Sequence, residues 1–317
     1  MKEYNFICMC TFKHSVSVNE SLLGKRIPIK IQNKYDGDIL LPILKPGDNM
    51  FELVAPYIDR MIYQEVCGKV SKSMVQDKTT LHPTIHGVFL GINLTEEVGE
   101  SHQDITQIIK EIELYASKFL KCVSLIHPSA IKWSYAREEG YVEPVNFYHT
   151  KQQINQKWTG HVNVNVDFSD DANELSHKEF LVIYKGLNKG ITLQYELLSD
   201  IYRCFERNEY REVVLNCATI IEITLKEQIE IYLDKLGTAA DIKKYILKSI
   251  DGFSKIFEAM KKFGISTDNC GAIKRGTVDV RNRVIHGRHI PTTEEVEQAI
   301  EDAKLIMKQY NVQLFTN

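Results

Sequence analysis

Long apolar runs are absent from this chain of 317 residues. No stretch approaches the roughly 18 consecutive apolar residues of a membrane-spanning helix. The opening residues, MKEYNFICMCTFKHS, also lack the apolar core of a secretory signal. We therefore expect neither insertion into a membrane nor secretion.

Paired cysteines are missing as well. The seven cysteines lie at positions 8, 10, 67, 122, 204, 217 and 270, and none of them stands in a CxxC pair. An odd and scattered set fits no disulfide framework, and we do not expect Cys8 and Cys10 to bind a metal. Reduced thiols are typical of the cytoplasm, where we expect the protein to act.

Motifs that hold metals or nucleotides are few and incomplete. The chain has no HExxH sequence, and the segment Gly24-Lys-Arg lacks the upstream glycine and the following Ser or Thr of a phosphate-binding loop. His82 and His86 have HxxxH spacing, but Pro83 favours a loop or strand, so we interpret the pair as incidental. The acidic run 167–171 is more typical of a turn than of a cation site. We therefore predict no metal and no cofactor.

The overall composition does not mark a general binder of polyanions. The net charge is −3, with 44% hydrophobic and 26% charged residues, as in ordinary globular proteins, and the length suggests two domains. One segment differs, because five Lys or Arg residues between Gly271 and Ile290 accompany a single acid, Asp279. Such a patch suits a confined phosphate site, and it equally suits a solvated helix face.

The character of the chain changes near Gly186. Before it, short alternating apolar segments separated by turn residues predict strands, and the segment 101–120 predicts one helix capped by Ser101. The clearest strand segments are 6–12, 27–31, 39–44, 88–94 and 161–168. We therefore expect an α+β domain over residues 1–185, with a hinge in the segment 186–190.

Residues 186–317 are predicted to be entirely helical. Apolar residues recur at helical spacing in the segments 193–205, 208–236, 242–260, 273–285 and 296–310. Asn208 is expected to cap the second of these helices and Gly237 to close it, while Thr292 and Glu295 form a capping box for the last. This pattern predicts an all-α bundle of four or five helices with short connections.

The most informative segment is Arg281-Asn-Arg-Val-Ile-His286. Residues at helical intervals through this region predict a core-facing stripe of Ile273, Thr277, Val280 and Val284. A second face carries Val278, Arg281, Asn282, Ile285 and His286. Apolar and functional side chains together on an outer face indicate a contact surface. Gly287 suits a helix C-cap, which would place His286 in the last turn.

Arg281, Asn282 and His286 provide the groups needed to break RNA without a metal. A guanidinium can neutralise charge on phosphate, an amide can orient its neighbours, and an imidazole with a pKa of about 6.5 can move protons. The same residues fit a simpler interpretation. The helix dipole favours a histidine near a helix C-terminus, and Arg and Asn are ordinary on a helix exterior.

The motif and the helices around it resemble the HEPN superfamily of small all-helical domains. Ribonucleases of that superfamily carry Arg, then Asn, Asp or His, then three to five residues, then His. Here the match is Arg281, Asn282 and His286, with the shortest spacing. The segment 210–222 resembles the family's long second helix. The resemblance covers about residues 193 to 310, and we find none before residue 190.

This resemblance implies both a fold and an activity. Active members dimerise, so that two copies of the motif face each other across one composite site and cut RNA without a metal. We therefore expect a metal-independent endoribonuclease that leaves a 2′,3′-cyclic phosphate, with Arg281, Asn282 and His286 as its catalytic residues. Members of the family imply a role in bacterial or phage defence, or as a toxin. The alternative is a catalytically silent HEPN-like module that dimerises or binds RNA on behalf of the N-terminal domain.

The expected partners are RNA and a second copy of the chain, bound through the C-terminal bundle. The side chains expected to contact RNA are Lys274, Arg275, Arg283, Arg288 and His289. The α+β domain would bind a trigger or select the RNA.

Overall fold

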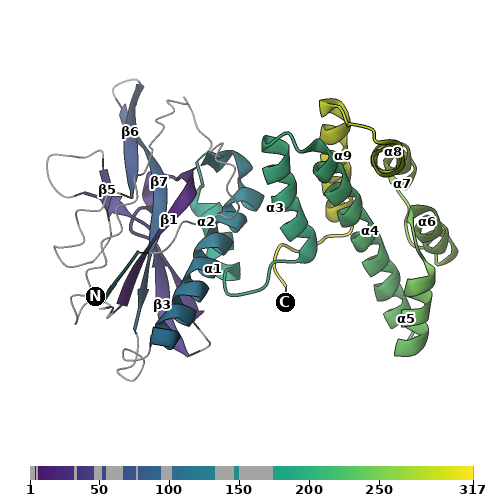
Figure 1. Cartoon of the computed structure of the whole chain (residues 1–317), viewed down its shortest axis with the longest axis horizontal. Coiled ribbons are helices and arrows are strands. Elements are labelled where there is room, and N and C mark those ends of the chain that lie inside the picture. Colours follow the sequence, from purple (N-terminus) through teal and green to yellow (C-terminus); the bar gives the residue numbers. More distant parts are fainter. Residues whose placement is uncertain are drawn as a thin grey trace. The chain divides into compact units, whose positions relative to one another are not determined.

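The computed structural model describes residues 4, 6–31, 34–45, 52–54, 67–75, 78–93, 102–132, 146–149 and 174–316 (Figure 1). The chain divides into two compact units, Met1–Gly190 and Ile191–Asn317. The first unit is α+β and the second is helical, as the sequence predicts. Helix α2 (His177–Gly186) contacts helix α1 (His102–Ile126), which is why the first unit extends past residue 185.

Among its described residues, the first unit contains one sheet whose strands all pair antiparallel. Its strands are β1 (Phe6–Ser17), β2 (Arg26–Ile31), β3 (Tyr35–Leu40), β4 (Ile43–Leu44), β5 (Glu52–Val54), β6 (Gly68–Val75), β7 (Lys78–Ile92), β8 (Ile131–Lys132) and β9 (Asn146–His149). The longest strand, β7, pairs with β1, β3 and β6 and so joins the branches of the sheet. Strand β2 shows why these segments extend, since Ile27, Ile29 and Ile31 are buried while their neighbours are exposed.

Two α-helices, with two short 3₁₀ helices, η1 (Glu20–Leu22) and η3 (Pro128–Ala130), complete the described part of this unit. Helix α1 buries the predicted apolar face, including Ile108, Ile112 and Phe119. Helix α2 is absent from the sequence prediction, although Ser176 and Glu179 form a capping box at its start. The predicted cap at Ser101, the predicted strand 161–168 and the acidic run 167–171 lie outside the described residues.

The second unit is organised around the long helix α4. Its helical elements are α3 (Leu193–Glu206), α4 (Tyr210–Lys235), α5 (Ala240–Ser249), α6 (Phe253–Lys262), α7 (Cys270–Ile273), the π-helical turn η4 (Lys274–Val278), α8 (Asp279–Gly287) and α9 (Thr293–Gln309). Helix α4 contacts α3, α5, α6, α8 and α9 (Figure 1). It packs against all of these helices because it has buried residues on several sides, among them Val213, Ile220 and Leu225.

Two details of the sequence prediction are wrong in this bundle. Asn208 does not cap α4; it takes a left-handed conformation (φ 58°), and Glu209 occupies the N-cap position without a side-chain bond. The predicted continuation of one helix past Gly252 also fails, because Gly252 has φ 79° and separates α5 from α6. Gly237 ends α4 as predicted, with φ 67°.

The π-helical turn η4 is held by a buried carboxylate from α9. Asp302 is 5% exposed and accepts hydrogen bonds from the hydroxyl of Thr277 (2.6 Å) and from the amide of Gln298 (2.8 Å). Gly276 leaves room for this carboxylate, since a Cβ there would lie 3.1 Å from Oδ2 of Asp302. The extra residue of the π turn shifts the facing of every residue after it, so this contact sets the register of α8.

Thr277→Val tests this contact, because it removes the hydroxyl donor and nearly conserves the side-chain volume. Leaving the buried Asp302 with one donor fewer should lower the free energy of unfolding by about 1–3 kcal/mol. Thr277→Ser keeps the hydroxyl and should cost about 0.8 kcal/mol for the lost methyl group. Urea unfolding followed by far-ultraviolet circular dichroism measures both; a valine variant no less stable than the serine variant would refute the role assigned to this hydrogen bond.

Candidate active site

The helical run from α7 through η4 to α8 presents its predicted core stripe to the bundle. Ile273, Thr277, Val280 and Val284 are all buried, which confirms the stripe. Val278 does not lie on the second face as predicted, because it is 4% exposed and belongs to the core. The π turn explains this difference, since its extra residue brings two neighbouring positions, 277 and 278, inward together.

Two of the three motif residues, Asn282 and His286, lie on the outer side of α8, and Arg281 lies on its flank. Arg281 is half-buried, whereas Asn282 and His286 are exposed. Nη1 of Arg281 donates a hydrogen bond of 3.1 Å to Oδ1 of Asn282. Asn282 and His286 are four residues apart within a regular α-helix, so their side chains point to the same side, one turn apart. The side chain of His286 makes no hydrogen bond or ion pair with any other residue that the structure describes.

Helix α8 ends one residue later than the sequence suggests. His286 lies in its last turn as predicted, but Gly287 is the final helical residue and not the C-cap. Arg288 takes the left-handed conformation instead (φ 54°, ψ 23°), and the backbone N–H groups of Arg288 and His289 both point to the carbonyl of Arg283. A left-handed arginine is uncommon, and it directs the chain sharply away from the helix axis after His286.

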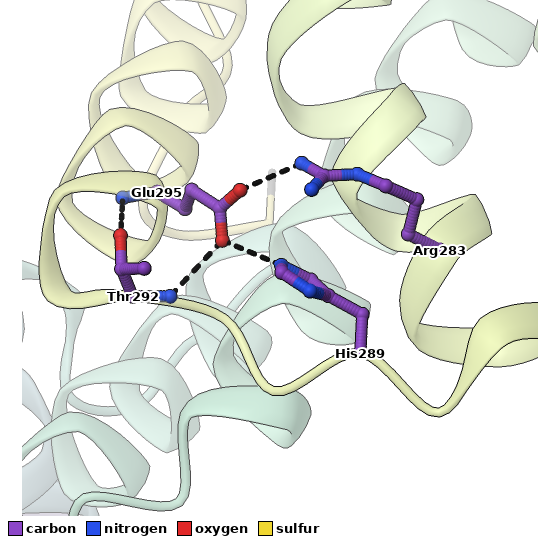
Figure 2. Close-up of polar contacts among 4 residues, drawn as sticks. All are labelled: Arg283, His289, Thr292 and Glu295. Carbon is purple, nitrogen blue, oxygen red and sulfur yellow. Dashed lines mark hydrogen bonds and ion pairs between the residues drawn. The ribbon is translucent and has the colours of Figure 1, made fainter.

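The carboxylate of Glu295 binds side chains on both sides of this turn (Figure 2). Glu295 accepts hydrogen bonds from Nη2 of Arg283 (2.6 Å), Nε2 of His289 (2.7 Å) and the backbone N–H of Thr292 (3.0 Å). The hydroxyl of Thr292 in return accepts from the N–H of Glu295, which completes the predicted capping box. Burial alone would raise the pKa of Glu295, but the hydrogen bonds from His289, Thr292 and Arg283 lower that pKa to about 2.

The five side chains predicted to contact RNA fall into two groups. Lys274, Arg275 and Arg288 are exposed, and their side chains have no hydrogen-bonding partner within the described ranges. Arg283 and His289 are engaged by Glu295. The structure therefore gives the basic patch three cations directed to solvent and two side chains that already hold an internal carboxylate.

Two contributors to this site were not predicted from the sequence. Nη2 of Arg211, from α4, donates a hydrogen bond of 3.1 Å to the carbonyl of Val284. That carbonyl lies in the last turn of α8, where acceptors lack helical partners. Glu295 was recognised as a capping-box residue, but nothing in the local spacing indicated its contacts with Arg283 and His289. These three contacts join segments that only the fold brings together.

Other groups able to do chemistry are engaged or buried. His82 and His86 lie on β7, where Nδ1 of His82 is 2.7 Å from Oε1 of Glu174, and burial together with Lys69 lowers the pKa of His86. All seven cysteines are buried, and burial raises the pKa of Cys122 to about 12 and that of Cys204 to about 11.

Across the described part of the chain, no group of three His, Cys, Asp or Glu residues is placed to hold a metal ion. Similarly, none of the described helices is both long and apolar enough to cross a membrane.

Comparisons with known proteins leave the family open. The chain matches no model of a protein family, no curated protein and no solved structure. The likeness to the HEPN superfamily thus remains a prediction from the motif and the order of the helices.

The lowered pKa of Glu295 implies that the free energy of unfolding depends on pH. A carboxyl whose pKa drops from 4.5 to about 2 on folding stabilises the folded state above pH 4.5 and loses this effect as the pH falls toward 2. Glu295→Gln should therefore lower the free energy of unfolding by about 1–2 kcal/mol at neutral pH, a figure reduced because Arg283 is half exposed.

This deficit should shrink as the pH is lowered from about 5 to about 3, because the wild type loses what the variant already lacks. Glu297→Gln is the control, since Glu297 is exposed on the same helix. Urea unfolding of the wild type and both variants across this pH range measures the difference. A deficit for Glu295→Gln that stays constant with pH would contradict the ionic role of Glu295.

Proposed function

We propose that the chain is a metal-independent endoribonuclease whose active site forms where two copies of helix α8 meet in a homodimer. The observation that carries the proposal is that Asn282 and His286 share the outer side of α8, while Arg281, on the flank of the helix, hydrogen-bonds to Asn282. Arg281 and Asn282 bind one another, and the imidazole of His286 has no partner among the described residues. Side chains that the fold does not use for its own stability are available for a substrate.

The proposed reaction needs two proton transfers and one site for negative charge. A ribose 2′-oxygen attacks the adjacent phosphorus and loses its proton to one imidazole, while the 5′-oxygen leaves and takes a proton from a second. The P–O5′ bond breaks as the P–O2′ bond forms, which leaves a 2′,3′-cyclic phosphate and a 5′-hydroxyl. Arg281 would neutralise the charge that grows on the phosphate oxygens, and Asn282 would orient the guanidinium.

The proposed dimer supplies the second histidine that the reaction needs. Each motif has one histidine, so two motifs facing one phosphate would provide both the base and the acid. Apolar side chains next to the motif favour such a contact, since Ile285 is 45% exposed and Ile290 is 74% exposed. The first unit would then bind a trigger or select the RNA, and the family likeness suggests a role in anti-phage defence or as a toxin.

A silent module is the second candidate, and one observation favours it. Two of the five basic side chains expected at RNA, Arg283 and His289, already bind Glu295. A domain whose basic patch is partly used in its own fold has less charge to offer to phosphates. On this alternative, the second unit dimerises or binds RNA without cutting it.

His286→Ala should abolish cleavage while the protein stays folded. Purified wild type and variant are incubated with mixed cellular RNA in EDTA, and the ends of the products are analysed. We expect cyclic phosphate ends with the wild type and at least a hundredfold slower cleavage with His286→Ala, since one acid–base group contributes about 10²- to 10⁴-fold. His177→Ala is the matched control, because His177 is also exposed on a helix but lies in the first unit.

Cleavage that persists in His286→Ala would refute the assignment of the chemistry to this residue. A wild type that binds RNA and leaves it intact, alone and in the presence of cell extract, would favour the silent module. Cleavage that stops in EDTA and returns with a divalent ion would refute the metal-independent mechanism.

Ile285→Lys should separate the two chains and thereby remove cleavage. A charge placed in an apolar contact between α8 helices is costly to bury, and it repels its own copy in a symmetric dimer. Analytical ultracentrifugation should show a dimer for the wild type and a monomer for this variant. Leu181→Lys is the control, since Leu181 is 40% exposed on α2. A dimeric and fully active Ile285→Lys variant would contradict the proposed interface.

A further inference from the structure

The side chains bound by Glu295 bracket the motif histidine. Arg283 stands three residues before His286 and His289 stands three residues after it, and one carboxylate holds both (Figure 2). The two bonds come from different parts of the chain, because Arg283 is on α8 and His289 follows the left-handed Arg288. Glu295 thus ties the helix end and the following turn to the same point on α9.

His286 depends on such outside support for its position. Its side chain has no hydrogen bond or ion pair with the rest of the described structure, so its backbone determines where the imidazole lies. That backbone is in the last turn of α8, where helices fray because their last carbonyls lack partners. The groups that hold this turn are Arg211, through the carbonyl of Val284, and Glu295, through Arg283 and His289.

We infer that Glu295 is a positioning residue for His286 in the proposed cleavage reaction. It holds both sides of the last turn of α8 and thereby fixes the position and orientation of the His286 imidazole. The inference rests on the proposed function and deepens it. It adds a residue that does not touch the RNA and acts through Arg283 and His289.

A competing role for the same carboxylate would be to keep Arg283 and His289 away from RNA phosphates. The geometry favours positioning, because Glu295 is fixed independently of these two side chains. Its carboxylate accepts the N–H of Thr292, and its own N–H donates to the hydroxyl of Thr292. A phosphate that displaced it would also have to break the capping box at the start of α9.

The test compares two substitutions that damage the same capping box in different ways. Glu295→Gln keeps an oxygen for the N–H of Thr292 and loses the charge that pairs with Arg283. Thr292→Ala removes the hydroxyl that caps α9 and leaves the carboxylate with Arg283 and His289. Both variants weaken the start of α9, but only the first releases the turn that carries His286.

Turnover is measured with a labelled single-stranded RNA oligonucleotide in EDTA, well below the unfolding temperature of every variant. We expect Glu295→Gln to lower kcat by about tenfold or more and to change KM by less than about threefold, because a displaced catalytic group slows chemistry more than binding. Thr292→Ala should keep kcat within about twofold of the wild type, even if it is the less stable variant.

Hydrogen exchange of the backbone amides over residues 284–290 gives a readout that does not require activity. Exchange in this segment should be faster in Glu295→Gln than in Thr292→Ala, and equal exchange would overturn the inference. If Glu295→Gln does not fold, His289→Ala removes one of the two tethers and should lower kcat in the same direction; an unchanged kcat would also overturn it.

Failure of the inference can be told apart from failure of the proposed function. An active wild type whose kcat is unchanged in Glu295→Gln overturns the positioning role alone. A faster Glu295→Gln variant with a lower KM also overturns it and shows that the carboxylate competes with RNA. A wild type that never cleaves RNA refutes the proposed function, and the catalytic part of this inference falls with it, while the exchange data still decide whether Glu295 holds the turn.

Discussion

Two carboxylates of helix α9 fix the helix that carries the motif. Asp302 binds Thr277 in the π turn before the motif, and Glu295 binds Arg283 and His289 around its end. These acids are seven residues apart, so they share one face of α9 two turns apart. The first contact sets which residues of α8 point outward and the second sets where the helix stops. The orientation of the motif residues therefore follows from how α8 docks on α9.

This arrangement separates the residues that hold the site from those that remain available. Thr277, Asp302 and Glu295 are buried or half-buried and carry the polar contacts of the fold, whereas Asn282 and His286 are exposed. Polar groups inside a bundle are costly unless they are satisfied, so contacts of this kind specify one docking of α8 over its alternatives. A rigid support behind exposed chemical groups is what a composite active site requires, since a second chain must meet them in a defined geometry.

Local patterns in the sequence were sufficient for the fold class and for much of the bundle. Apolar periodicity predicted α3, α4 and α9, and the spacing of Thr292 and Glu295 predicted the last capping box, because these signals are read within one or two turns. The π turn and the burial of Val278 do not follow from local spacing, since a π turn depends on the partner helix and has no local signature. The contacts of Arg211 with Val284 and of Glu295 with His289 also cannot be predicted from local spacing. They join segments that are distant in sequence or separated by an irregular turn.

In the proposed dimer, two copies of α8 present their His286 side chains to one phosphate. A crystal structure of the full chain with an RNA oligonucleotide whose 2′-hydroxyl groups are methylated tests this directly, because the 2′-oxygen is kept but cannot attack the phosphorus. We expect a two-fold symmetric dimer in which both imidazoles lie within hydrogen-bonding distance of the oxygens around a single phosphorus atom. Two His286 side chains on separate surfaces, with the RNA bound elsewhere or not at all, would contradict it.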